Sequence, residues 1–193
     1  MKIGYFALAM GVMVIACAGH PDEASDSASQ ETALHDDGWD DDRCRPAPPG
    51  IPAALAVPDD ECLTAKVRGV GVQIYRCTAG AWLNIAPEAN LLNRNGRFVG
   101  NHFFGPNWQW RDGSKVRAAK VAEVNAPDSA HDIPWLLLSV VGQDGAGRLA
   151  GVLHLQRLNT AGGVAPAGNC TNGAEVRVPY AADYLFYRLD SQE

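Results

Sequence analysis

The sequence lacks the short motifs that mark the common classes of enzyme and of nucleic-acid-binding protein. It contains no GxSxG nucleophile motif, and Gly69-Val-Gly71 lacks the third glycine of a dinucleotide-binding loop. Lys and Arg are not clustered, so the chain presents no electrostatic footprint for nucleic acid. These absences argue against a GxSxG hydrolase, a nicotinamide-dependent oxidoreductase and a nucleic-acid-binding protein, and we expect no cofactor.

The apolar run near the N-terminus is too short for a comfortable transmembrane helix, which needs roughly 20 apolar residues. The run ends in VIAC at Cys17, a pattern similar to a bacterial lipobox. We therefore predict that residues 1–16 are a lipoprotein signal peptide and that lipid on Cys17 anchors the protein in a membrane. Ala18 rather than Asp follows the cysteine, which favours the outer membrane of the cell envelope; ordinary secretion is the alternative.

Acidic residues are concentrated in one stretch. Residues 18–42 hold nine of the 22 acidic residues and no Lys or Arg, so the rest of the chain is close to neutral. A segment this polar and acidic buries too little apolar surface to offset its ordering entropy. We interpret residues 17–43 as the lipidated cysteine followed by a flexible acidic tether, and residues 44–193 as one domain.

Export to an oxidising compartment makes the other four cysteines informative. Cys44, Cys62, Cys77 and Cys170 allow three disulfide connectivities. We favour Cys44–Cys62 as a local link at the start of the domain and Cys77–Cys170 as a long-range link. The chain has no CxxC pair and its histidines are scattered, so we predict no metal site.

From Lys66 onward, short apolar segments alternate with turns. Asn95-Gly96 between two apolar runs is a strong hairpin signal, and 142–147 is a glycine-rich loop. Nine or ten short strands in about 130 residues predict an all-β fold, an antiparallel β-sandwich or a barrel-like domain. Residues 115–124 have an alternative as a helix, because their alanines suit one.

Three polar residues are candidates for catalysis. Strand alternation places His102 on one face with Phe98 and Gly100, either as a hydrogen-bonded packing residue, which we favour, or as a titrating group. Asp112 precedes Gly and Ser, which is most simply a turn. Arg157 lies in line with leucines and either extends to solvent, pairs with an acid such as Asp183, or recognises an anion; we favour the pair.

Three further residues are candidates for ligand binding. Trp108 shares a face with Trp110, so the two form either part of the core, which we favour, or an exposed stacking platform. Gln156 and Asn159 are polar residues on an otherwise apolar strand that also contains Leu153. Trp135 lies in a continuous apolar run and is predicted to be inside.

Several blocks together resemble one family. They are GVQIYRCTA, APEANLLN, GRFVGNHFFGPNWQWRDGSKV, IPWLLL, QRLNTAGGVAP and VPYAADYLFYR. In this order they closely resemble the domain-of-unknown-function family 3455 of secreted bacterial and fungal proteins, over roughly residues 66–188. The resemblance implies an exported single-domain protein without an established activity. It also favours pairing of Cys77 with Cys170, because both lie where cysteine is usual in bacterial members.

Two functional hypotheses follow. The first is a non-enzymatic binding module of the cell envelope, displayed on the Cys17 anchor, that binds an envelope polymer or protein. The alternative is an envelope hydrolase or lyase with a site centred on His102. A cleft that joins His102, Asp112, Gln156 and Arg157 would favour the enzyme. A purely structural domain would have no concave polar pocket.

Overall fold

The computed structural model describes residues 44–190. The predicted signal peptide, the predicted lipidation site Cys17 and the predicted acidic tether therefore lie outside the described residues. Within residues 44–190, no helix combines the length and the apolar character that crossing a membrane requires.

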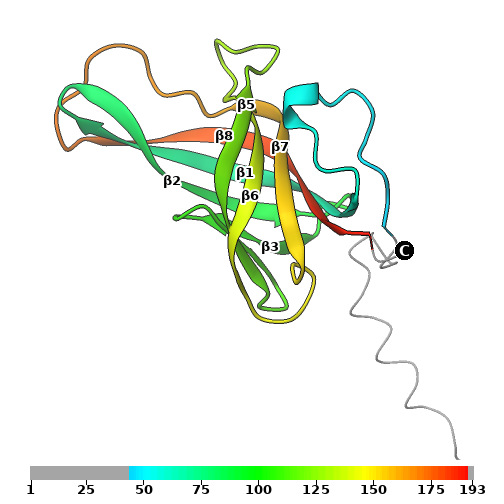
Figure 1. The fold of residues 1–193 in the computed structure, drawn as a ribbon. Coiled ribbons are helices and arrows are strands. Elements are labelled where there is room, and N and C mark those ends of the chain that lie inside the picture. The colour runs from blue at the N-terminus through cyan, green and yellow to red at the C-terminus, as the bar shows by residue number, and fades with distance from the viewer. Residues whose placement is uncertain (1–43, 191–193) are drawn as a thin grey trace, which may run out of the picture. The chain divides into compact units, whose positions relative to one another are not determined.

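Eight antiparallel strands in the described part of the chain close into a barrel, in which each strand pairs with the next and β8 pairs with β1 (Figure 1). The strands are β1 (Glu61–Thr78), β2 (Ala81–Leu92), β3 (Phe98–Phe103), β4 (Asn107–Trp110), β5 (Lys115–Val124), β6 (Trp135–Asp144), β7 (Val152–Gly162) and β8 (Glu175–Leu189). The short 3-10 turn η2 (Ala53–Leu55) precedes them. This confirms the all-β antiparallel prediction in its barrel form.

Residues 115–124 form strand β5, so the helical alternative for this segment is wrong. Val116 and Ala118 are buried inside the barrel, and the whole segment pairs with β6. The eight strands in the described residues are fewer than the nine or ten short strands expected, because several of them are long: β1 has 18 residues, β8 has 15 and β2 has 12.

Glycine in β1 allows the barrel to close tightly around a buried tyrosine. A Cβ atom on Gly69 would lie 2.5 Å from Cε2 of Tyr184, which has no exposed surface. Gly in a strand interior commonly marks such a close approach. The tyrosine ring therefore occupies the space that a side chain on β1 would otherwise take.

Two apolar clusters hold the domain together. The larger cluster fills the barrel interior and takes buried residues from all eight strands. The smaller cluster lies on the outer face, where Leu137, Leu158 and Tyr187 contact Leu55 of η2. Gln156 Nε2 donates to Leu55 O at 2.6 Å, which fixes the N-terminal segment beside β7 (Figure 1).

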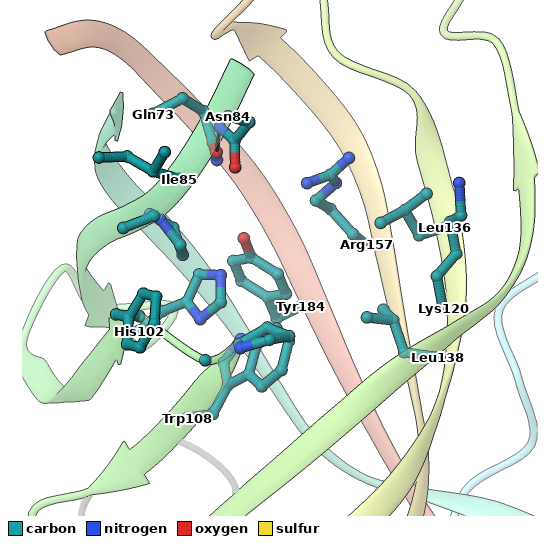
Figure 2. A pocket seen from close by; sticks show the side chains of 15 residues that line it. Gln73, Asn84, Ile85, His102, Trp108, Lys120, Leu136, Leu138, Arg157 and Tyr184 are labelled. Carbon is teal, nitrogen blue, oxygen red and sulfur yellow. Dashed lines mark hydrogen bonds between the residues drawn. The ribbon is translucent and has the colours of Figure 1, made fainter. Parts of the chain in front are cut away.

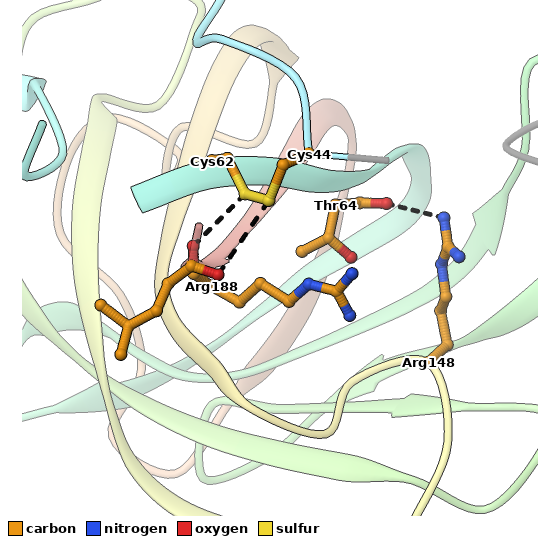
Figure 3. Close-up of a disulfide and its surroundings, with 6 residues drawn as sticks. Cys44, Cys62, Thr64, Arg148 and Arg188 are labelled. Carbon is orange, nitrogen blue, oxygen red and sulfur yellow. Dashed lines mark hydrogen bonds between the residues drawn. A yellow bond between two sulfur atoms is a disulfide. The ribbon is translucent and has the colours of Figure 1, made fainter. Parts of the chain in front are cut away.

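Both favoured disulfide pairings are confirmed. The Cα atoms are 5.1 Å apart in Cys44–Cys62 and 5.8 Å apart in Cys77–Cys170. The first bond attaches the start of the described chain to β1, close to the end of β8 (Figure 3). The second joins the end of β1 to the loop before β8.

Irregularities in the strands change which side chains face inward. The register of β3 shifts against β2, and as a result Val99 is buried (1% exposed) whereas Phe98 is 47% exposed. The prediction that Phe98 shares a face with His102 is therefore wrong. A similar shift near the start of β7 leaves Leu153 exposed while Leu155 is buried. Trp135 is only partly buried and packs on the outer cluster, not inside the barrel as predicted.

Candidate functional site

A cavity of about 340 Å³ lies inside the barrel, and every strand contributes at least one residue to its wall (Figure 2). Phe104, in the turn between β3 and β4, is one of the lining residues and is exposed to solvent. Eight-stranded barrels have an interior just wide enough to be filled by side chains or to hold one small ligand. In this barrel the core cluster fills one part of the interior and the cavity occupies another.

Three rings form one wall of the cavity. His102 and Trp108 are cross-strand partners on β3 and β4, and their rings stack with centroids 4.1 Å apart and planes 9° apart. Tyr184 of β8 meets both rings edge-on, at centroid distances of 5.2 Å and 5.6 Å. All three residues are buried, which confirms the prediction that Trp108 and its neighbour Trp110 belong to the core.

His102 is held as a neutral ring. Burial lowers the pKa of His102 from 6.5 to about 3; the hydrogen bond to Asn107 opposes this shift, and the positive charge of Arg157 adds to it. Nδ1 lies 2.9 Å from Asn107 O, so in the neutral ring Nδ1 carries the proton and Nε2 is an acceptor. This confirms the interpretation of His102 as a hydrogen-bonded packing residue.

Arg157 reaches into the cavity from β7 (Figure 2). Its Nε and Nη2 atoms donate to Pro134 O at 3.1 Å and 2.8 Å, which fixes the guanidinium plane. The predicted pair with Asp183 is wrong. Asp183 lies on the outer face of the barrel, where it accepts a hydrogen bond from Arg68 at 3.0 Å and forms an ion pair with Lys66 at 3.2 Å.

Two polar residues of the wall were missed by the sequence analysis. Asn84 Nδ2 donates to Gln73 Oε1 at 2.8 Å, and Gln73 is only 4% exposed. Its Nε2 group is buried without a hydrogen-bond partner, and so is the indole Nε1 of Trp108. The only sequence signal for Gln73 is its position between Gly71 and Tyr75, as a polar residue on the inward face of β1.

The remaining candidate residues lie elsewhere. Asp112 stabilises the turn before β5, where its carboxylate accepts from Ser114 N at 2.8 Å and from Arg148 N at 2.7 Å. Gln156 faces the outer cluster and accepts from the Tyr187 hydroxyl at 2.7 Å. Asn159 is on the outside and donates to Asp183 at 3.0 Å. Of the four residues whose convergence would favour an enzyme, only His102 and Arg157 share the cavity.

The cavity therefore combines a flat aromatic wall, an apolar wall and one fixed cation. The apolar side includes Ile85, Leu136 and Leu138. Within residues 44–190, the groups of metal-ligating side chains are limited to one cluster that contains the disulfide-bonded Cys44 and Cys62, and it lies apart from the cavity. The arrangement suits the binding of a small molecule better than proton transfer near neutral pH, since its histidine does not titrate there.

Comparison with known proteins identifies one family, which is described as one of unknown function. No curated protein and no solved structure matches the chain. A family described as "Protein of unknown function (DUF3455)" matches residues 58–188, which cover β1 to nearly the end of β8. The match includes every residue of the cavity wall. The chain therefore belongs to the DUF3455 family.

Proposed function

We propose that this protein is a non-enzymatic binding module of the cell envelope, anchored through lipid on Cys17, that holds a small molecule in the barrel cavity. The cavity in the barrel interior carries this proposal. Ligand sites in proteins are typically concave, mostly apolar and supplied with a few fixed polar groups. The apolar wall and the fixed Arg157 fit that description.

The size of the cavity favours a small ligand over the envelope polymer or protein that the sequence suggested. The space is about 340 Å³, near the lower end of the range of roughly 300–1,000 Å³ that is usual for small-molecule sites. Binding of an envelope polymer or protein stays a prediction for the outer surface.

A substitution that fills the cavity tests the binding site. Leu136 lines the cavity and is partly buried, so Leu136→Trp should occupy the space that a ligand needs. Leu83→Trp is the matched control, because Leu83 is 50% exposed and lies outside the cavity wall. Thermal-shift screening of the full chain against small organic acids, amides and amines should give compounds that stabilise the unaltered protein and Leu83→Trp but not Leu136→Trp. Equal stabilisation of both variants would place the binding elsewhere.

The lipid anchor has its own test. Palmitate labelling of cells that express the full chain should label the unaltered protein and not the Cys17→Ala variant. Cell fractionation should find the labelled protein with the outer membrane. Unchanged labelling of Cys17→Ala would refute the anchor, without affecting the proposal for the cavity.

A further inference from the structure

The charges in the cavity wall are all of one sign. Arg157 and Lys120 line the cavity, and no Asp or Glu is among its lining residues. Lys120 already has a partner, because its Nζ pairs with Glu123 at 2.6 Å. Within residues 44–190 no carboxylate lies within 4 Å of Arg157, whose hydrogen bonds go to Pro134 O. The cavity therefore holds one fixed positive charge without a counter-charge.

The charge of Arg157 acts on the groups around it. Burial lowers the pKa of His102 and raises the pKa values of Tyr75 and Tyr184, and the positive charge of Arg157 lowers the pKa of all three groups. An unpaired charge in a partly buried site is costly, and an anion that replaces the lost hydration recovers part of that cost. The electrostatics of the cavity thus favour an anion and disfavour a cation.

Hydrogen-bonding groups at this side of the cavity point to the same class of ligand. Arginine has five N–H donors, of which the contacts with Pro134 O engage one on Nε and one on Nη2. Gln73, whose buried Nε2 has no acceptor, and the Arg157 guanidinium both lie at the end of the cavity away from Trp108 (Figure 2). A carboxylate accepts on both of its oxygens and suits the planar fork of arginine.

The other walls require an apolar body. The stacked rings of His102 and Trp108, which are 4% and 1% exposed, form one wall of the cavity, and Leu136 and Leu138 lie across the cavity from them (Figure 2). A space of about 340 Å³ accommodates a ring with a short chain. Because Nδ1 of His102 is engaged by Asn107 O, the ring stays in place as part of this wall.

We infer that the cavity binds a compact organic carboxylate, with its charge held by Arg157 and its apolar body between the His102–Trp108 stack and the leucines of β6. This inference rests on the proposed function, since it names the class of ligand for the same cavity. The cavity selects by charge at one side and by shape at the other.

Three probes of the same shape test the inference. Phenylbutyrate, its primary amide and phenylbutylamine carry a negative, a neutral and a positive group on one apolar body. Isothermal titration of each into the full chain should give the carboxylate at least about tenfold tighter binding than the amide, and no measurable binding of the amine, because a charge-assisted hydrogen bond is worth more than a neutral one.

Arginine variants identify the group responsible. Arg157→Gln should lower the affinity for phenylbutyrate to that of the amide, and Arg157→Lys should keep part of the preference because it keeps the charge but loses the fork. Arg76→Gln is the matched control, since Arg76 is exposed and pairs with Glu175 outside the cavity. It should bind phenylbutyrate like the unaltered protein.

Each outcome separates the two proposals. Preferential binding of the amide or the amine that Leu136→Trp abolishes would overturn the carboxylate inference and leave the binding module standing. A carboxylate preference that survives in Arg157→Gln would also overturn it. If none of the three probes binds, both proposals fail for ligands of this size. Should Arg157→Gln not fold, the comparison of the three probes on the unaltered protein still decides for or against a carboxylate.

Discussion

Acidification should destabilise the barrel through His102, and the size of the effect follows from its surroundings. The ring is 4% exposed, stacked on Trp108 and influenced by the positive charge of Arg157. Burial lowers the pKa of His102 in the folded protein to about 3, against 6.5 for the unperturbed group. Between these two values the unfolded chain binds a proton that the folded protein does not bind. Stability therefore rises with pH in this window and is lost as the pH falls through it.

A pH of 5 lies about 1.5 units below the unperturbed pKa of His102. Protonation of His102 in the unfolded chain therefore lowers the free energy of unfolding at pH 5 by about 2 kcal/mol relative to pH 7. Although burial opposes the change, hydrogen bonds lower the pKa of the Asp112 and Asp183 carboxyls. Their contributions are present above the ordinary carboxyl pKa of roughly 4 and are lost below it, so they act mainly at lower pH than His102.

Urea unfolding of the full chain at pH 7 and pH 5, for the unaltered protein and for His102→Gln, measures the effect. Glutamine can still donate to Asn107 O but does not titrate. The unaltered protein should lose about 2 kcal/mol more than the variant between the two pH values. Equal losses would refute the neutral, buried state of His102, because the titration of all other groups is common to both proteins.

Two further predictions concern the scaffold. Gly69→Ala should lower the free energy of unfolding by about 1–3 kcal/mol, because the new Cβ would lie 2.5 Å from the Tyr184 ring. Gly142→Ala is the control: its Cβ would meet ordinary contacts from 3.5 Å, so it should cost less than about 1 kcal/mol. Urea unfolding compares the two variants, and equal costs would contradict the close approach. The double variant Cys77→Ser, Cys170→Ser removes a disulfide between residues that are 93 apart in sequence. Its free energy of unfolding should fall by roughly 4–5 kcal/mol in the chain-entropy model, measured as a shift of the urea midpoint. A fall of less than about 1 kcal/mol would show that the disulfide does not constrain the unfolded chain.

The elements that the sequence predicted correctly depend on local signals. Alternation of apolar and polar residues, together with the turn at Asn95-Gly96, predicts antiparallel strands whatever their partners are. Asp112 forms a turn with Ser114 because the side chain bonds to a residue two positions away. The Cys44–Cys62 link is also short in sequence. Each of these features needs little information from distant parts of the chain.

The features that the sequence did not predict depend on how the strands pair. Arg157 lies opposite Tyr184, and Asp183 lies opposite Leu158, so the arginine and the acid point to different sides of the sheet. Val99 rather than Phe98 faces the interior because the register of β3 shifts against β2. No periodicity within one strand records which residue of the partner strand lies opposite.

The cavity was missed for the same reason. Gln73 and Arg157 are on β1 and β7, and they reach one space only because the barrel closes through β8. Residue patterns identified His102, Trp108 and Arg157 as candidates, but the predicted cleft joined His102 and Arg157 to Asp112 and Gln156, which face other surroundings. Residue type alone identified unusual side chains, and closure of the sheet decided which of them share a site.

A crystal structure of the full chain with a ring-brominated phenylbutyrate tests the central claim most directly. The bromine gives an anomalous signal that locates the apolar body independently of the protein. We expect that signal between the His102–Trp108 stack and Leu138, with the carboxylate within hydrogen-bond distance of the Arg157 guanidinium. A bromine outside the barrel, or a carboxylate turned away from Arg157, would contradict the account.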